Sequence, residues 1–164
     1  MKKFILLFIL IPNISLAASM SMIGEKGKLS EVDRVIEVKM YDNFYKPNEI
    51  KIKKGETIKF IVHNFGELVH EFNIATKKMH LKHQPEMSKL VENEILLGDK
   101  IDKKKMKEMA KKDHSMSHSH ANSVLLEPNE SGEIIWKFNT AAKLEAACNI
   151  PGHYETGMIA KIKY

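Results

Sequence analysis

The sequence predicts an all-β sandwich interrupted by a partly helical insertion, and three observations lead to this prediction. Apolar residues alternate with charged residues over positions 34–75 and again over 123–164. Gly, Pro and Asn punctuate both stretches at short intervals. Between them, positions 77–122 are rich in Lys, Met, His and Glu and show no alternation. A period of two is typical of half-buried strands, and the turns indicate about seven or eight antiparallel strands in two sheets.

The chain begins with the pattern of a secretory signal peptide. Two lysines precede an apolar run over residues 4–11, and a short stretch with small residues follows and reaches Ala17. The apolar run is too short to span a bilayer, and the order of segments predicts cleavage after Ala17. We therefore expect residues 1–17 to be removed and residues 18–164 to form one periplasmic domain without stable membrane insertion. Loss of the two lysines lowers the formal charge from +5 to +3.

The first alternating stretch contains four runs with an apolar face. The residues expected to face the core are Val38 and Met40, Ile50 and Ile52, then Ile58, Phe60 and Val62, and finally Leu68, His70, Phe72 and Ile74.

The second alternating stretch repeats the pattern up to the end of the sequence. The residues expected inside are Val124 and Leu126, then Ile134, Trp136 and Phe138, and finally Met158, Ala160, Ile162 and Tyr164. A short strand is expected to end at Cys148, followed by a loop.

The insertion over residues 77–122 has its own character. Positions 88–112 have helical propensity, and lysines are frequent from Lys100 to Lys112. A structureless loop of this length is unusual in a compact domain, so we expect the insertion to be partly helical or mobile, and functional. Its lysines form a solvated helix face or a surface that steers an acidic partner.

Cys148, His153 and Met158 form the motif with the most chemical content. The segment reads Cys-Asn-Ile-Pro-Gly-His-Tyr-Glu-Thr-Gly-Met, with four residues between successive members of the trio. A thiolate, two imidazoles and a weak axial thioether hold a single copper ion in electron-transfer sites. Cys148 is the only cysteine, so it forms no internal disulfide, and the alternative is an inert buried thiol. A metal-bound thiolate better explains a lone cysteine in an exported protein.

His70 is the best candidate for the second imidazole. It shares a strand face with apolar residues and follows a turn, whereas His63 falls on the opposite face of its strand. A hydrogen-bonded core histidine is the alternative for His70. Nothing in the pattern fixes the positions of the histidines in the insertion, which are His80, His83, His114, His118 and His120.

These residues give the chain a resemblance to the cupredoxins, the small blue or green copper proteins, over about residues 34–75 and 123–164. The Cys148–Met158 loop is most similar to that of rusticyanin-like bacterial cupredoxins. The resemblance implies a Greek-key β-sandwich with one copper ion bound by His70, Cys148, His153 and Met158, and electron transfer between Cu(I) and Cu(II). Many members have Asn or Ser after the first histidine, whereas this chain has Glu71. A nearby carboxylate favours Cu(II), so we predict a lowered reduction potential.

Two functions follow from these observations. The first is a periplasmic carrier of single electrons, and the alternative is a copper-homeostasis protein that binds, buffers or delivers copper. A secondary copper site is considered at His114, Met116, His118 and His120, since imidazole suits Cu(II) and thioether suits Cu(I). We expect no enzymatic activity, a monomer, a redox partner or a copper donor or acceptor as the partner, and no nucleic acid.

Overall fold

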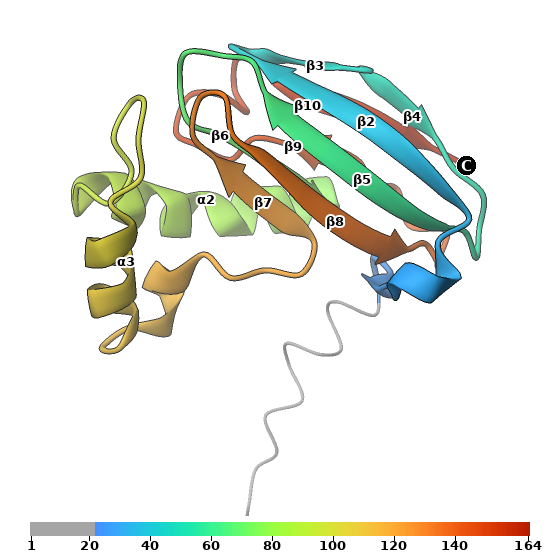
Figure 1. Cartoon of the computed structure of the whole chain (residues 1–164), viewed down its shortest axis with the longest axis horizontal. Coiled ribbons are helices and arrows are strands. Elements are labelled where there is room, and N and C mark those ends of the chain that lie inside the picture. Colours follow the sequence, from blue (N-terminus) through green and yellow to red (C-terminus); the bar gives the residue numbers. More distant parts are fainter. Residues whose placement is uncertain (1–21) are drawn as a thin grey trace, which may run out of the picture.

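The structure is a computed structural model that describes residues 22–164 (Figure 1). The expected signal peptide, residues 1–17, lies outside the described residues. Within them, ten strands form two five-stranded sheets, which confirms the expected β-sandwich and adds short edge strands to the predicted number. The first sheet consists, in spatial order, of β1 (Glu25–Lys26), β8 (Ser131–Lys137), β5 (Thr57–Asn64), β2 (Arg34–Tyr41) and β3 (Phe44–Lys46). The second consists of β4 (Glu49–Lys51), β10 (Ile159–Lys163), β9 (Glu145–Ala147), β6 (His70–Ala75) and β7 (Ser123–Leu126).

Two strand pairs correct the expectation of a purely antiparallel arrangement. β2 pairs in parallel with β5, and β4 pairs in parallel with β10. The chain leaves the first sheet after β3, adds β4 to the second sheet and returns, so β5 enters beside β2 in the same direction. This crossing between sheets was not visible in the alternation pattern, which carries no information about strand direction.

The main core lies between the two sheets and contains the predicted apolar faces. Phe60, Phe72, Trp136 and Phe138 are fully buried there, and Phe72 packs with its ring centroid 5.5 Å from that of Phe60. Two expected core residues are corrections: Leu68 precedes β6 and is 39% exposed, and Tyr164 follows β10 and is 48% exposed. All six residues of β6 are buried, because the insertion covers the strand face that the alternation pattern predicted to be exposed to solvent.

The insertion is ordered by helices with capped ends. α2 spans Lys77–Glu92, α3 spans Lys103–Ala110 and a short 3-10 helix, η2, spans His114–Ser117. A residue before each one accepts a backbone N–H: the Thr76 hydroxyl accepts from Met79, and the Asp102 carboxylate accepts from Lys105. Asp113 caps η2 in the same way. The predicted helical stretch over 88–112 was therefore placed too late, because Thr76 starts a helix at Lys77.

The insertion also has an apolar cluster of its own. Figure 1 shows α2 and α3 at the end of the sandwich beside β7. Met87 and Leu90 of α2 pack there with Met116, and Val69 contributes from the segment before β6. Met116, which the sequence offered as a copper ligand, therefore serves packing.

Candidate metal centre

The loop that carries Cys148, His153 and Met158 is held between β9 and β10. The Cys148 amide donates to the Met158 carbonyl at 3.2 Å, and the Met158 amide donates to the His153 carbonyl at 3.0 Å. Gly152 and Gly157 have φ values of 89° and 92°, a conformation that residues with a Cβ rarely adopt. The three predicted ligands thus lie on a tightly hydrogen-bonded loop between two paired strands.

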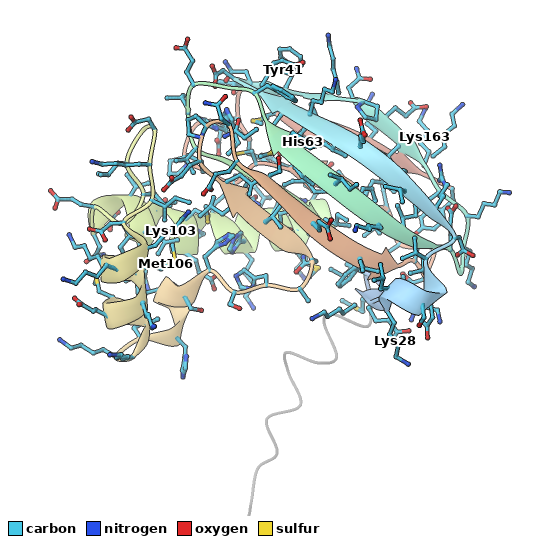
Figure 2. All side chains as sticks on the ribbon, in the orientation of Figure 1. Lys28, Tyr41, His63, Lys103, Met106 and Lys163 are labelled. Carbon is cyan, nitrogen blue, oxygen red and sulfur yellow. The ribbon has the colours of Figure 1, made fainter. Side chains whose placement is uncertain are left out.

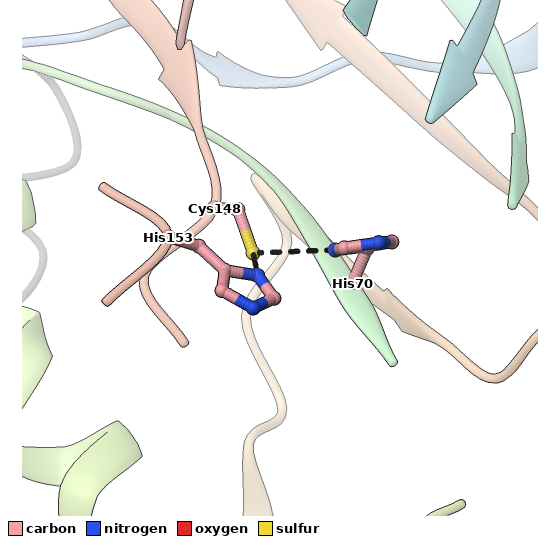
Figure 3. Close-up of side chains that lie close together, drawn as sticks. All are labelled: His70, Cys148 and His153. Atoms are coloured by element: carbon pink, nitrogen blue, oxygen red, sulfur yellow. Dashed lines mark hydrogen bonds between the residues drawn. The ribbon is translucent and has the colours of Figure 1, made fainter. Parts of the chain in front are cut away.

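The structure brings His70 to this loop. The Cys148 Sγ lies 3.3 Å from His153 Nδ1 and 4.0 Å from His70 Nδ1 (Figure 3). The two imidazole rings lie 5.0 Å apart between centroids. His70 and Cys148 are fully buried, whereas His153 is partly exposed. His63, the rejected candidate, lies on β5 of the first sheet, where its Nδ1 is 2.7 Å from the hydroxyl of Ser131 on the neighbouring β8.

Asp42 fixes the orientation of the His70 ring. Its Oδ1 lies 2.8 Å from His70 Nε2 and also accepts the backbone N–H of Glu67 at 3.1 Å and of Leu68 at 3.3 Å. A carboxylate that accepts from Nε2–H leaves Nδ1 unprotonated and directed at the thiol, as in many metal sites with a carboxylate behind the histidine. Burial raises the pKa of Asp42, but the hydrogen bonds from His70 and the two amides lower it below its ordinary value.

The protonation state of the site follows from its burial. Burial raises the pKa of the Cys148 thiol to about 12, although the Glu71 backbone N–H donates to Sγ at 3.4 Å and opposes this effect. Burial also lowers the pKa of His70 and of His153, so both imidazoles are neutral at neutral pH. A cation that binds here therefore displaces a proton from the thiol and finds two neutral nitrogen donors.

Met158 is the fourth predicted ligand. It is fully buried in the main apolar cluster, directly before β10. The imidazole of His70 and the imidazole, thiolate and thioether of the loop match the donor set of a mononuclear copper centre rather than that of Ca²⁺ or Mg²⁺. The residues present therefore fit a copper ion.

Glu71 makes contacts with the ligand loop and the insertion that the sequence did not reveal. Its side chain is fully buried, and its Oε2 accepts the Asn149 backbone N–H at 3.1 Å and the Asn149 side-chain N–H at 2.7 Å. Its Oε1 accepts the Ser123 hydroxyl at 2.6 Å and lies 2.9 Å from His118 Nε2 and 3.3 Å from His83 Nε2. Burial raises the pKa of Glu71, but the contacts with His118 and His83 outweigh it and hold this pKa well below its usual range. The effect of this ionised carboxylate on the reduction potential stays a prediction.

The histidines of the insertion are held in place, which corrects the expectation that nothing fixes them. His80 is fully buried, with Nδ1 3.2 Å from the Asn149 side-chain oxygen. His83, His118 and His120 form a second group with potential ligand atoms all within 4.8 Å of one another. His114, by contrast, is exposed on η2, and Met116 is buried among apolar side chains, so the structure keeps both apart from this group.

A signal for this second group was present in the sequence. His80, His83, Met87 and Leu90 recur at intervals of three or four, which places them on one face of a helix. That pattern predicts that the face packs against the domain, and it brings His83 to the interior.

The comparisons with known proteins agree with the fold. The family described as "Cupredoxin-like domain" matches residues 12–99, more than half of the chain. Copper-resistant cuproprotein CopI of Pseudomonas aeruginosa is 41% identical over 153 residues, which cover 85% of this chain and 80% of that protein. The protein of the same name from Rubrivivax gelatinosus is 30% identical over 140 residues, 85% of this chain and 71% of that protein. The chain therefore belongs to the cupredoxin-like family.

A solved structure confirms the fold class. Sodium-dithionite-reduced auracyanin from Roseiflexus castenholzii superposes with a TM-score of 0.56 at 18% sequence identity, over 80% of this chain and 97% of that chain. Among residues 22–164, no helix is long and apolar enough to cross a membrane.

Proposed function

We propose that this chain is an exported protein that binds one copper ion at His70, Cys148, His153 and Met158 and that acts in copper resistance. The observation that supports the proposal most directly is the approach of the Cys148 Sγ to the Nδ1 atoms of both imidazoles, at 3.3 and 4.0 Å. The names of the relatives from Pseudomonas aeruginosa and Rubrivivax gelatinosus, both copper-resistant cuproproteins, support the physiological role. The export pattern of residues 1–17 supports a periplasmic location.

The residues of the site perform distinct tasks in this role. A bound copper ion supplies one-electron chemistry between Cu(I) and Cu(II). Asp42 keeps His70 in the tautomer that presents Nδ1 to the ion. The burial of Cys148 excludes water and other thiols, so the thiolate is protected from oxidation once it holds metal. No substrate is converted in this role, and the protein acts by binding.

A titration of the metal-free mature protein with Cu(II) tests the binding site. We expect an intense thiolate-to-copper absorption band that saturates at one equivalent and is lost in Cys148→Ala. The physiological role is tested by growth on copper of a strain that lacks the gene, complemented with the wild type or with Cys148→Ala. Restoration of growth by Cys148→Ala as fully as by the wild type would contradict a role through this site.

Electron carriage is a second candidate, because apolar side chains surround the exposed edge of His153. A hollow of about 180 Å³ is lined by His153 together with Leu68, Leu97 and Pro151. Leu68 and Leu97 are 39% and 37% exposed, and an apolar rim at a metal ligand suits brief docking of a redox partner. Leu68→Lys with Leu97→Lys should slow electron exchange with such a partner and leave the absorption band unchanged. Full copper resistance in this double variant would favour the binding role over the carrier role.

A further inference from the structure

The histidines of the insertion are arranged around a common point. The ring centroids of His83, His118 and His120 are separated by 5.5, 5.1 and 5.3 Å. His83 comes from α2, whereas His118 and His120 come from the loop between η2 and β7. Two segments that are distant in sequence therefore deliver three imidazoles to one place.

The surroundings of the three imidazoles resemble the outer sphere of a metal site. His83 Nε2 faces the group, and its Nδ1 lies 2.9 Å from a Glu86 carboxylate oxygen. A carboxylate behind a ligating imidazole fixes its tautomer and orientation. His118 also has a left-handed backbone, with φ 41° and ψ 44°. A residue with a Cβ in this region is uncommon, and such strained positions gather where ligands bind.

The buried carboxylate of Glu71 lies at the base of the group. It faces His83 Nε2 and His118 Nε2 at 3.3 and 2.9 Å, and its side chain is fully buried. A buried negative charge requires a positive partner, and a divalent cation held by the neighbouring imidazoles provides one. Glu71 Oε1 also accepts the Ser123 hydroxyl at 2.6 Å and the Asn73 side-chain N–H at 3.0 Å, and its position beside the imidazoles lets it add one oxygen donor to the three nitrogen donors.

The group is accessible from solvent. A hollow of about 340 Å³ is lined by His118 and His120 and reaches Met106 of α3 and Leu125 of β7. Figure 2 shows Lys103 and Met106 on the side of α3 that faces β7, at the border of this hollow. The side chain of His120 is 39% exposed, so an ion can arrive without opening the fold.

We propose that His83, His118 and His120 form a second metal site, with Glu71 as its carboxylate, which binds a divalent transition-metal ion, Cu(II) foremost. Imidazole nitrogen is a common donor for Cu(II) and Zn(II), and Cu(II) binds such sites more tightly than the other divalent ions of the first row. The site shares no ligand with the copper centre proposed above, although Glu71 contacts both through its backbone N–H and its carboxylate.

The test titrates Cu(II) into the metal-free full-length mature protein and follows total copper, visible absorption and electron paramagnetic resonance. We expect two equivalents, of which only one carries the intense band, while the other shows the resonance of ordinary Cu(II) with nitrogen ligands. His120→Ala should weaken the second equivalent by more than about 100-fold, because it removes a ligand rather than an outer-sphere partner. His120 has no hydrogen bond to Glu71, so this variant leaves the buried carboxylate paired and should keep the intense band.

His114→Ala is the matched control, because His114 lies in the same segment but outside the group, and both equivalents should persist. The same affinity for the second equivalent in His120→Ala as in the wild type would overturn the proposed site. Displacement of this Cu(II) by an equimolar amount of Zn(II) would overturn the choice of ion. Cys148→Ala should lose the intense band and keep the equivalent that depends on His120, so failure of one site is distinguishable from failure of the other.

Discussion

Removal of the Asp42 carboxylate should weaken copper binding without changing a ligand. Asp42 Oδ1 lies 2.8 Å from His70 Nε2, and the side chain also accepts two backbone amides of the segment that precedes β6. In Asp42→Ala the His70 ring loses the partner that selects its tautomer, and water can occupy the space because the Asp42 side chain is 38% exposed. Loss of such an outer-sphere carboxylate typically costs about 10–100-fold in metal affinity.

The expected change in binding free energy is about 1.4–2.8 kcal/mol, since each factor of ten corresponds to about 1.4 kcal/mol. Asp42→Asn should fall between the wild type and Asp42→Ala. Its amide oxygen can still accept from the imidazole and the two backbone amides, but a hydrogen bond to a neutral acceptor is roughly half as strong as one to a carboxylate.

The assay is competition for copper against a chromophoric chelator at fixed pH, with the intense absorption band as a second readout. Asp113→Ala is the control, because Asp113 also accepts a backbone N–H, from Ser115, but lies on η2 away from His70. A dissociation constant for Asp42→Ala within about threefold of the wild type would refute the role assigned to Asp42, since the structure predicts at least tenfold.

Three further predictions follow from the same geometry. Gly66→Ala should weaken copper binding about as much as Asp42→Ala, because the new Cβ would clash with Asp42 Oδ1 and would lie 2.8 Å from His70 Nε2. Gly98→Ala is the control in the same competition assay, because its Cβ would make only an ordinary contact with Leu68, at 3.9 Å. Copper binding to the metal-free protein should release one proton, because burial raises the pKa of the Cys148 thiol to about 12. The apparent affinity for copper should therefore rise about tenfold per pH unit near neutral pH. Calorimetry in buffers of different ionisation enthalpy measures the released proton, and an affinity that does not change with pH would contradict this prediction. Tyr45→Phe should lower the free energy of unfolding by about 0.5–1.5 kcal/mol in urea titrations, because the buried hydroxyl donates to the Glu71 carbonyl at 2.6 Å, and an unchanged midpoint would contradict it.

The parts of the site that the sequence predicted are those set by local spacing. Cys148, His153 and Met158 share one loop, and the alternation around His70 placed it inside, so both strands and ligands could be found without tertiary information. Leu68 was assigned wrongly because strict alternation was extended past the beginning of β6. Local sequence patterns therefore predicted the metal-ligating residues that lie on a strand or directly beside one in the sequence.

The second histidine group depends on contacts that alternation does not encode. His83 is 35 residues from His118, and only the packing of α2 against the sandwich brings them together. The sequence did hold two partial signals, the cap at Thr76 and the three- and four-residue spacing from His80 to Leu90. Together these signals predict the start and the buried face of α2, but not the loop that meets it.

The buried carboxylate of Glu71 explains why the insertion is part of the domain rather than an appendage to it. Its backbone N–H donates to the Cys148 sulfur, and its carboxylate accepts from Asn149, the next residue of the ligand loop. The other carboxylate oxygen faces His83 and His118 of the insertion. Asn73 and Ser123 also donate to this carboxylate, but a buried charge is costly without positive partners, so the two histidines of the insertion help to hold Glu71 and the ligand loop in place. The helices thus stabilise the copper centre through a single charge, and any ion bound by the histidines would act on the same charge.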